Sequence, residues 1–545
     1  MQSLHSSWNN KRTRLPPPIH LLGLALLLLP SLPSPTSSCT KQEKVSLLRF
    51  LEGLSQDSGL TASWRNDTNC CMWKGIICDA DDAVKEISLA SMSLEGRISS
   101  ASLGNLTSML SLNLSCNSLS GDLPEELLLS RSMVVFDVSF NNLNGDLHKL
   151  PSTTGRPMQV INISSNRFAG QIPSTTLESM ENLVAINMSN NSFTGKIPST
   201  ICAKNHSFHI PVGLGSCSAL RVLKAGHNKL TGTLPDELYN ATSLEHLSFP
   251  NNRLQGALSP EYIVKSNNLV ILDLAENELT GEIPANIGQL NRLEELHLET
   301  IILRGNSFHG ELNNVNFSTL SDLKILDFML NKFTGTVPES LYFCSNLIAL
   351  RLSSNNFHGQ FSPRLGNLKS LKFLSLTNNS FTNITNALQV LKSSWNLTTL
   401  LIGTNFKGEA MPEDETIDGY QNLQVLSIAD CSLSGKIPHW LSKVKKLREL
   451  LLSNNQLTGP IPALTNYCPK LLNLGNNKFS GVIPMEIGHL KGLAALNLSF
   501  NNLHGEVPQS NCNLTNLRVL ELSNNHLTGE IPAALENLHF LSFFF

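Results

Sequence analysis

The sequence predicts an α/β, β-rich right-handed solenoid, in which one short strand from each coil joins a parallel sheet along a concave face. First, the pattern L-x-L-x-x-N-x-L-x-G-x-I-P recurs through most of the 545 residues. Second, its L-x-L segment has the period of two that is typical of a strand with one buried face. Third, only 15% of the residues are charged, against roughly 25% in an average domain, because turn residues and Asn take the places of charges.

The N-terminal 38 residues have the order of a secretory signal peptide. Basic residues precede an apolar run over 19–29, and small and polar residues follow over 31–38. We therefore expect residues 1–38 to be removed and the chain to enter the secretory pathway, as an extracellular protein or at the outer face of the plasma membrane. A retained N-terminal anchor is the alternative, although the apolar run is shorter than the about 20 residues of a membrane span. No later run reaches that length, so we expect no membrane span in this chain.

Residues 39–83 are expected to form an N-terminal cap that is stapled by disulfides. Four of the eleven cysteines fall here, at Cys39, Cys70, Cys71 and Cys78. Clustered cysteines in a secreted chain usually form disulfides, and we expect the pairs Cys39–Cys70 and Cys71–Cys78. Zinc binding is the alternative, which secretion and the lack of accompanying His disfavour.

Asn-x-Ser/Thr acceptor sites for N-glycosylation are frequent, and in a secreted chain several should carry glycan and face solvent. Part of this frequency reflects the high Asn content. The fourteen acceptors are Asn66, Asn105, Asn113, Asn162, Asn187, Asn190, Asn205, Asn240, Asn316, Asn378, Asn383, Asn396, Asn497 and Asn513.

Residues 84–541 hold about eighteen copies of the repeat, mostly 24–26 residues apart. One strand alone buries little, but copies stacked about 4.8 Å apart build a continuous apolar core and a concave face on the order of 80 Å long. The Asn of each copy can satisfy backbone groups of adjacent coils, which predicts a buried polar ladder. Its position is occupied by Met92, Asn117, Asn141, Asn166, Asn191, Asn228, Asn252, Asn277, Asn306, Asn331, Asn355, Asn379, Asn405, Cys431, Asn455, Asn477, Asn501 and Asn525.

Three intervals depart from the repeat period. They lie near residues 200–217, 298–306 and 463–470, and each requires a loop or a local repacking of the solenoid. Residues 542–545 end the chain partway into a further repeat without a cap, so we expect an exposed apolar end that frays or aggregates. Its side chains would be Leu535, Leu538, Phe540 and Leu541.

Several cysteines lie shortly before the strand of a repeat, and we expect them to be small buried hydrophobic residues. These are Cys217, Cys344, Cys468 and Cys512. A disulfide between Cys202 and Cys217, across the first irregular interval, is the alternative for that pair.

The repeat with its Gly-x-Ile-Pro ending is identified as the plant-specific leucine-rich repeat. The cap run Cys70-Cys71-Met-Trp73-Lys-Gly75-Ile-Ile-Cys78 resembles the N-terminal cap of plant leucine-rich-repeat receptors. Four further runs are similar to the ectodomains of the phytosulfokine receptor and the tyrosine-sulfated glycopeptide receptor. These runs are Leu223-Lys-Ala-Gly-His-Asn228, Asn383-Ile-Thr-Asn-Ala-Leu388, Asn396-Leu-Thr-Thr-Leu400 and Met411-Pro-Glu-Asp414.

The resemblance implies a horseshoe or superhelix that is the extracellular ligand-recognition module of a plant peptide-hormone receptor. It also implies two partners. One is a small secreted peptide of the tyrosine-sulfated class, bound on the concave face. The other is the ectodomain of a co-receptor kinase, so that the chain would signal only through a partner kinase.

The chain departs from this family pattern in three respects. The island domain that such receptors insert late in the solenoid is missing, and only a short junction near residues 463–469 stands in its place. Neither a transmembrane helix nor the kinase motifs occur in the sequence. Two alternatives therefore stand beside the receptor: a receptor fragment without function of its own, or an interaction module or decoy built from the same repeat, such as an inhibitor of a wall-degrading enzyme.

Matching the family's ligand pocket onto this chain implies eight ligand-binding residues on the concave face. The resemblance gives Arg304 the role of pairing bidentately with a sulfate, with the hydroxyls of Ser375 and Thr377 as further donors. A solvated face of ordinary polar residues is the alternative for any single position. The eight residues are Arg304, Arg351, Ser353, Ser375, Thr377, Thr404, Ser427 and Asp430.

Charge and motifs argue against several other classes of function. The net charge of −3 is too small to mark a nucleic-acid binder. The patterns H-E-x-x-H, G-x-S-x-G and G-x-G-x-x-G do not occur, and the fifteen His are scattered along the repeats. We therefore expect no catalytic residue, no metal site and no cofactor.

Overall fold

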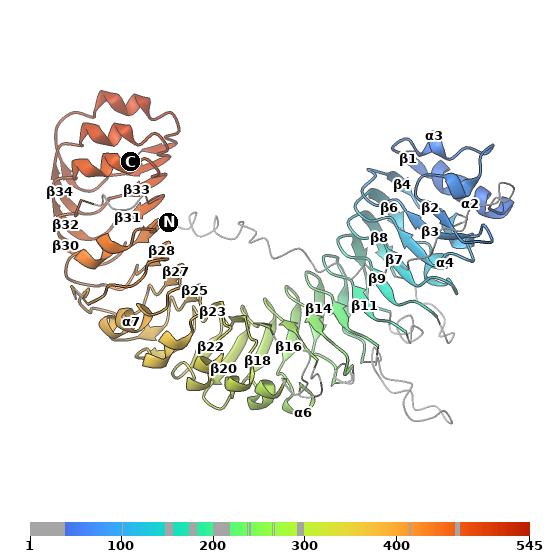
Figure 1. Ribbon diagram of the computed structural model, residues 1–545, viewed down its shortest axis with the longest axis horizontal. Coiled ribbons are helices and arrows are strands. Elements are labelled where there is room, and N and C mark those ends of the chain that lie inside the picture. Colours follow the sequence, from blue (N-terminus) through green and yellow to red (C-terminus); the bar gives the residue numbers. More distant parts are fainter. Residues whose placement is uncertain are drawn as a thin grey trace.

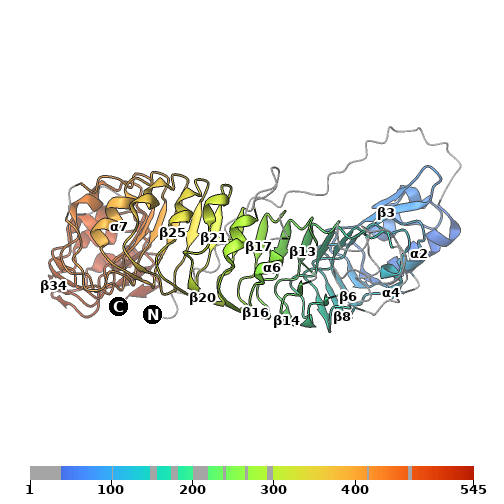
Figure 2. The same ribbon diagram turned by 90° about the horizontal axis from the view of Figure 1, so that it is seen from below.

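A computed structural model gives the structure, which describes residues 39–544 except 101, 148–155, 174–181, 200–218, 237, 239–240, 264, 266–267, 291–298, 414–415 and 464–468. The described chain forms one open arc of coils, with strands along its inner side and the helices α6 (Pro260–Ile263) and α7 (Ile384–Leu391) on its outer side (Figure 1). Figure 2 shows that the coils follow one another in single file. The signal peptide, the irregular interval at 200–217 and the residues Cys202, Cys217 and Cys468 fall outside the described residues.

The N-terminal cap is built around two disulfides and two stacked indole rings. Its elements are α2 (Lys41–Glu52), β1 (Leu54–Gln56), α3 (Leu60–Ser63), the 3₁₀ turn η2 (Cys70–Met72) and β2 (Ile76–Cys78). Disulfides join Cys39 to Cys70 and Cys71 to Cys78, as the sequence predicts. The buried rings of Trp64 and Trp73 stack with 5.5 Å between their centroids.

One carboxylate ties the cap to the first repeat. Thr40 and Glu43 form a capping box at the start of α2. The Oε1 atom of Glu43 also accepts a hydrogen bond of 3.0 Å from the backbone N–H of Val84. The start of the cap helix and the start of the first solenoid strand therefore share one side chain.

The main sheet is parallel and continuous, and β2 joins its first strand antiparallel. Each of the eighteen predicted copies of the repeat contributes one strand, and β37 adds a further strand at the C-terminal end. Its strands are β3 (Val84–Ser88), β5 (Ser111–Asn113), β7 (Val135–Asp137), β9 (Val160–Asn162), β11 (Ala185–Asn187), β13 (Val222–Lys224), β15 (His246–Ser248), β17 (Ile271–Asp273), β19 (Thr300–Ile302), β21 (Ile325–Asp327), β23 (Ala349–Arg351), β25 (Phe373–Ser375), β27 (Thr399–Leu401), β28 (Val425–Ser427), β29 (Glu449–Leu451), β31 (Leu471–Asn473), β33 (Ala495–Asn497), β35 (Val519–Glu521) and β37 (Phe543–Phe544).

Short strands that follow the Asn of most repeats form further parallel ladders, and β1 of the cap pairs antiparallel with the first of them. They are β4 (Glu95–Arg97), β6 (Ser118–Asp122), β8 (Asn142–Asp146), β10 (Arg167–Ala169), β12 (Thr194–Lys196), β14 (Lys229–Gly232), β16 (Arg253–Gly256), β18 (Glu278–Gly281), β20 (Ser307–Glu311), β22 (Lys332–Thr334), β24 (His358–Gly359), β26 (Ser380–Phe381), β30 (Thr458–Gly459), β32 (Lys478–Gly481), β34 (Asn502–Gly505) and β36 (His526–Leu527).

Short helical turns complete the coils. Besides α6 and α7 they are α4 (Glu125–Leu128) and the 3₁₀ turns η3 (Leu103–Asn105), η6 (Ala285–Gln289), η7 (Phe317–Thr319), η8 (Glu339–Phe343), η9 (Pro363–Asn367), η10 (His439–Lys443), η11 (Met485–His489), η12 (Gln509–Asn513) and η13 (Ala533–Asn537). Within the described residues, none of the helices has the length and apolarity that crossing a membrane requires.

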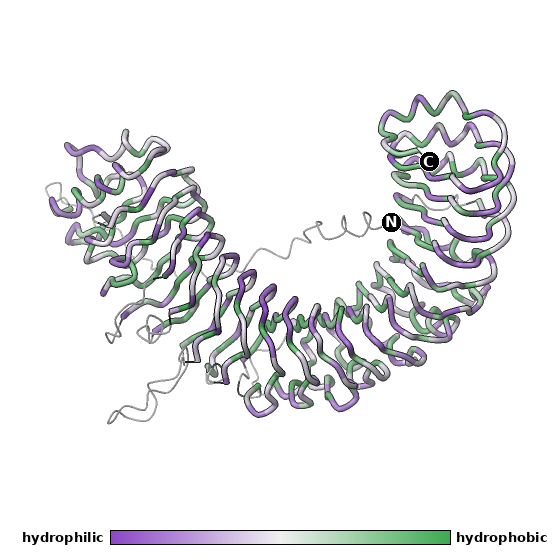
Figure 3. Tube along the Cα trace, turned by 180° about the vertical axis from the view of Figure 1, so that it is seen from behind, coloured by the Kyte–Doolittle hydropathy of each residue, from purple (hydrophilic) through white to green (hydrophobic). Residues whose placement is uncertain are grey.

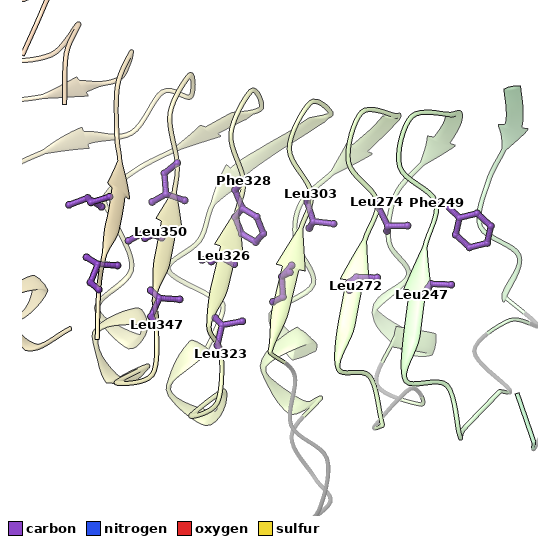
Figure 4. Packing of buried hydrophobic residues seen from close by; sticks show 14 of the residues in the cluster. Leu247, Phe249, Leu272, Leu274, Leu303, Leu323, Leu326, Phe328, Leu347 and Leu350 are labelled. Atoms are coloured by element: carbon purple, nitrogen blue, oxygen red, sulfur yellow. The ribbon is translucent and has the colours of Figure 1, made fainter. Parts of the chain in front are cut away.

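The apolar core runs through the whole arc as ladders of equivalent side chains. Hydrophobic and hydrophilic residues alternate along each coil (Figure 3), so that every coil turns the same positions inward. The two leucine positions of the L-x-L motif stack from strand to strand (Figure 4), and six such side chains are at most 1% exposed: Leu247, Leu272, Leu326, Phe249, Leu274 and Phe328. A coil lacks a core of its own and is buried by its neighbours.

The predicted Asn ladder is present, and Asn277 illustrates its geometry. Its Nδ2 donates to the carbonyl oxygens of Leu274 and Ala275 in its own coil, at 3.1 Å each, and to that of Phe249 in the preceding coil, at 2.9 Å. Its Oδ1 accepts from the N–H of Leu254 at 3.0 Å. One buried amide thus joins two coils through four hydrogen bonds. These bonds satisfy buried backbone groups at the point where each coil leaves the main sheet.

Gly281 shows why the motif requires glycine after its third leucine position. The residue has φ +86°, in the region that residues with a Cβ rarely adopt. A Cβ there would also lie 2.8 Å from the Cβ of Ala257. Both the turn and the close approach of the neighbouring coil therefore exclude a side chain.

The main sheet crosses all three irregular intervals without losing register. Ile186 pairs with Leu223 across the first interval, Leu272 with Ile301 across the second and Leu450 with Leu472 across the third. The extra or missing residues are accommodated between strands, so the inner face stays continuous.

The C-terminal coil differs in part from the expected exposed end. Phe540 is 59% exposed, but Leu538 is only 4% exposed, and Leu535 and Leu541 are partly buried. The expectation for Leu538 was wrong because this side chain packs against the core of the preceding coil. Phe543 and Phe544 of β37 are also exposed, at 56% and 44%.

Two cysteines are buried thiols that pack as small hydrophobic residues do. Cys344 is fully buried, its Sγ contacts the carbonyl oxygen of Phe317 at 3.2 Å, and burial raises its pKa to about 12. Cys431 occupies an Asn position of the ladder, where burial raises its pKa to about 11. Neither thiol is therefore ionised at physiological pH.

Candidate ligand-binding face

The last residues of successive strands form one line across the main sheet, which we call the inner row. Strand register places each of these residues directly opposite the next. They flank the buried leucine of each strand, so their side chains leave the sheet on the concave side. In order, the inner row is Asn113, Asp137, Asn162, Asn187, Lys224, Ser248, Asp273, Ile302, Asp327, Arg351, Ser375, Leu401, Ser427, Leu451, Asn473, Asn497 and Glu521.

Charges gather in the middle of the inner row, and Arg351 is the best-anchored of them. Its Nη1 donates to Oδ2 of Asp327 at 3.3 Å, and its guanidinium lies over the ring of Phe373, 4.7 Å from the centroid. The Asp327 side chain is 2% exposed and the Arg351 side chain 34%. Burial raises the pKa of Asp327, and the charge of Arg351 opposes that rise. The cation remains within reach of a ligand, whereas the carboxylate does not.

Arg304 lies two residues past the end of β19 and is half-exposed. Its Nη2 is 3.9 Å from Oε1 of Glu276, a distant ion pair on the side that faces β17. Ser375 lies on the opposite side, three strands away, or about 14 Å at the usual strand spacing. The structure therefore does not bring Arg304 together with Ser375 and Thr377, because its guanidinium contacts Glu276 on the other side, and a role of Arg304 in sulfate binding stays a prediction.

Ser353 and Ser375 are not free donors on the surface. Each residue is 3% exposed, and their Oγ atoms lie 2.5 Å apart in a mutual hydrogen bond. The expectation that both face a ligand was wrong, because adjacent coils bring the two short side chains together in a buried hydrogen bond. They stabilise the spacing of β23 and β25 instead.

The other four predicted residues lie further along the same face. Thr377, Thr404 and Ser427 are half-buried, and Asp430 is exposed. The Oδ1 atom of Asp430 accepts a 2.7 Å hydrogen bond from Nδ2 of Asn454 in the next coil. The structure thus pairs Arg351 with Asp327, whose pKa the charge of Arg304 also lowers, and leaves these four as a mostly uncharged stretch.

Asp273 and Lys224 are charged members of the inner row that the sequence analysis missed. Burial raises the pKa of Asp273, while the N–H of Ala275 and the charge of Arg304 oppose that rise. Burial lowers the pKa of Lys224. His246, on the strand that pairs with the strand of Asp273, also has a lowered pKa, through burial and the nearby Lys224.

A sequence signal for these residues existed. The middle residue of Leu272-Asp273-Leu274 and of Leu326-Asp327-Phe328 has the same offset in its repeat as Arg351. In a stack of repeats, the strand register places residues with the same offset opposite one another. Both carboxylates therefore had to lie in the same row as Arg351. A half-buried carboxylate on a strand is unusual enough to mark a candidate site.

The N-glycosylation acceptors are accessible wherever the structure describes them. Exposed acceptors are Asn66, Asn105, Asn190, Asn316, Asn378, Asn396 and Asn513, and half-buried ones are Asn113, Asn162, Asn187, Asn383 and Asn497. Asn205 and Asn240 fall outside the described residues. Glycosylation at these positions stays a prediction.

The side chains on this face are suited to binding a ligand. Its polar groups are arginines, carboxylates, a lysine and hydroxyls spread along an open surface, with apolar Ile302 and Leu401 among them. Among the described residues, no three His, Cys, Asp or Glu side chains converge as metal ligands would. Such a strip can hold an extended, mixed-charge ligand.

Family models match both the cap and the solenoid. The model described as the leucine rich repeat N-terminal domain matches residues 40–79. The Leucine Rich Repeat model matches residues 182–203, 268–290, 422–444, 446–468, 469–490 and 516–538.

Two relatives from Arabidopsis thaliana illustrate the similarity in sequence. The chain is 39% identical to Receptor-like protein 3 over 149 residues, which are 27% of this chain and 20% of the relative. It is 45% identical to Phytosulfokine receptor 1 over 89 residues, 16% of this chain and 9% of the relative. The matched part thus spans about a fifth to a quarter of the first curated relatives.

Two solved structures share the solenoid. A TDR receptor is superposed with a TM-score of 0.65 at 27% identity, over 83% of this chain and 82% of that one. The Arabidopsis receptor kinase HAESA, solved in complex with the peptide hormone IDA and the co-receptor SERK1, has a TM-score of 0.56 at 26% identity, over 92% of each chain.

Proposed function

The chain is a leucine-rich-repeat protein with the solenoid fold of plant receptor ectodomains, and we propose that it is the extracellular ligand-recognition module of a plant peptide-hormone receptor. The observation that carries the proposal is the charged middle of the inner row. Four charged side chains, Asp273, Arg304, Asp327 and Arg351, come from four successive coils of one concave strip. A solenoid places such a strip along an extended ligand.

We propose that the ligand belongs to the tyrosine-sulfated peptide class and that Arg304 receives the sulfate. Among the described residues, the ion pair of Arg304 is a 3.9 Å contact with Glu276, so its donors are available to a stronger acceptor. Guanidinium groups pair bidentately with tetrahedral oxyanions. Arg351 is the second cation within this strip, and its stacking on Phe373 holds it in place for the rest of the peptide.

Signalling in this proposal passes through a partner kinase. HAESA was solved with a peptide hormone and a co-receptor together, and its fold aligns with this chain over 92% of both. By analogy, we propose that peptide binding creates a joint surface for the ectodomain of a co-receptor kinase. The protein would act outside the cell or at the outer face of the plasma membrane.

A matched pair of peptide libraries tests the ligand class without knowledge of the ligand's sequence. Randomised heptapeptides with a fixed central sulfotyrosine would be selected on the immobilised, secreted chain, next to the same library with tyrosine. We expect the sulfated library to yield binders, and the best sulfopeptide to bind about tenfold or more tightly than its unsulfated twin in calorimetry. Failure of every selected peptide to bind at tens of micromolar, or equal affinity of the twins, would overturn the sulfated class.

A further inference from the structure

Six glycosylation acceptors lie on the inner face rather than on the outer turns. Asn113, Asn162, Asn187 and Asn497 belong to the inner row, and Asn190 and Asn378 follow it by three residues. All six are half-buried or exposed. Four of them fall on the N-terminal coils of β5, β9 and β11, and two fall on the coils of β25 and β33.

The local hydrogen bonds of two acceptors engage the amide oxygen rather than the reactive nitrogen. Asn113 Oδ1 accepts from both the N–H and the hydroxyl of Ser115, at 3.0 and 2.7 Å. Asn497 Oδ1 accepts from Ser499 in the same way, at 2.9 and 2.7 Å. Because the two atoms of an amide diverge, Nδ2 of each points away from its own turn. The Nδ2 atoms of Asn162 and Asn190 donate to the preceding coil, to Asp137 Oδ2 and Ser165 Oγ at 3.1 Å each, so a glycan at either position replaces that bond.

Glycans at these positions would cover the N-terminal part of the concave face. Asn113 and Asn187 are three strands apart, or about 14 Å, with Asn162 between them. An N-glycan is bulky on that scale. Three or four of them side by side exclude a macromolecular ligand from this stretch.

The stretch from β13 to β23 carries no acceptor on its inner face, within the residues that the structure describes. We call the inner face of these six strands the open window. It contains Lys224, Asp273, Asp327 and Arg351, with Arg304 beside the row. The charges from Lys224 to Arg351 thus lie in a segment without acceptors, whereas Asp137 lies among the N-terminal acceptors and Glu521 lies beside Asn497.

We propose that N-glycans on the N-terminal inner face act as a shield that confines the ligand to the open window. The inference rests on the proposed function for the existence of a peptide ligand, but the shield itself does not depend on it. Six strands span about 24 Å. An extended peptide of about seven residues has that length, so the ligand is a short peptide or a short exposed segment of a larger one.

Radical footprinting tests the shield without any ligand. Phe140 and Leu330 occupy the same place in their repeats, with φ +53° and +54°, and are 59% and 50% exposed. Phe140 lies between the coils of Asn113 and Asn162, whereas Leu330 lies in the coil of β21. We expect enzymatic trimming of the glycans on the secreted chain to raise the oxidation of Phe140 several-fold and to leave that of Leu330 unchanged.

A variant with four sequons removed supplies the matched control. The substitutions Ser115→Ala, Ser164→Ala, Ser189→Ala and Ser192→Ala abolish the four N-terminal acceptors of the inner face, and Ser318→Ala abolishes the acceptor at Asn316 on an outer turn. The fourfold variant should show high Phe140 oxidation before trimming, and Ser318→Ala should behave as wild type. Unoccupied acceptors by glycopeptide mass spectrometry, or no change at Phe140 on trimming, would overturn the shield.

A sequon placed inside the open window tests where the ligand lies. The double substitution D273N/A275S creates an acceptor whose sequence matches Asn497-Leu498-Ser499, and D273N alone controls for the lost charge. Relative to D273N, the double variant should bind the selected sulfopeptide about tenfold or more weakly, and trimming should restore binding. Undiminished binding by a chain that mass spectrometry shows to be glycosylated at position 273 would overturn the window. Absence of peptide binding by wild type would count against the proposed function, while footprinting alone would decide the shield.

Discussion

The guanidinium of Arg351 covers the carboxylate of Asp327 on the neighbouring strand, with 3.3 Å between Nη1 and Oδ2. Only the arginine remains accessible, because the Asp327 side chain is 2% exposed. The pair therefore fixes one cation in the centre of the inner row and shields the anion that orients it. Removing Arg351 should therefore cost more stability than removing Asp327, since a buried charge without its partner is costly and an exposed one is not.

Arg351→Ala should destabilise the protein by about 2–3 kcal/mol, because it leaves the Asp327 carboxylate buried and unpaired. Adding Asp327→Ala should recover part of the loss. Arg364→Ala is the matched control, since Arg364 pairs with Glu339 at 3.4 Å on the surface, where both side chains are more than half exposed and the cost is below about 1 kcal/mol. Urea unfolding of the four proteins gives the comparison. Equal losses for Arg351→Ala and Arg364→Ala would contradict the burial argument.

Asn277→Ala should lower the thermal midpoint markedly. The substitution removes four hydrogen bonds and leaves backbone groups of two coils unsatisfied in the core, at a cost of about 2–3 kcal/mol. Gln255→Ala serves as the control, because its side chain makes one exposed bond to Glu278. Equal thermal midpoints of the two variants in calorimetry would show that the buried Asn side chain contributes no more to stability than an exposed one.

Asn511→Leu should stabilise the C-terminal coils. Asn511 is fully buried, and neither atom of its amide has a hydrogen-bond partner among the described residues. The equivalent position holds Ile487 in η11 and Leu535 in η13, so leucine fits there. Removing the unsatisfied amide should contribute about 1–3 kcal/mol. The control is Gln509→Leu, which lies on the exposed side of the same turn. Equal thermal midpoints of the two variants would contradict this account.

Asp273→Asn should raise stability at neutral pH and have little effect near pH 4. Burial raises the pKa of Asp273 above its ordinary value of about 4. A raised pKa in the folded state means that folding favours the protonated acid. The corresponding stability is complete below the ordinary pKa and is lost as pH rises through the raised pKa. Asparagine does not ionise, so the stability gap between variant and wild type should widen from about pH 4 to pH 7.

The charges that act on Asp273 set the size of this effect. Arg304 and His227 favour its ionised form, whereas Asp327 disfavours it. Thermal midpoints of wild type and Asp273→Asn measured at several pH values give the test. Parallel curves across that range would show that Asp273 titrates at its ordinary pKa.

The repeat alone predicted the strands, the apolar ladders and the Asn ladder, because each depends only on spacing within one coil. Leu272 and Leu274 had to face inward, and Asn277 had to meet the preceding coil, once copies stacked in register. The disulfides followed from the clustering of four cysteines in the cap. Such features are local or repeat identically from coil to coil.

The candidate site was less predictable because it depends on contacts between particular neighbours. Ser353 and Ser375 were expected to face a ligand but bond to each other. Arg304 points toward Glu276 and away from Ser375. Rotamer choice and neighbouring side-chain length decide these contacts, and no single-coil pattern contains them. The alignment of Asp327 with Arg351, in contrast, was available from equal repeat offsets.

The affinity of the selected sulfopeptide for three forms of the secreted chain tests the central claim most directly. Calorimetry would compare wild type, Arg304→Ala and Arg364→Ala, the last of which removes an arginine from an outer turn. If Arg304 receives the sulfate on the concave face, Arg304→Ala should weaken binding about tenfold or more, and Arg364→Ala should leave it within about twofold of wild type. Wild-type affinity in the Arg304→Ala protein would contradict the account.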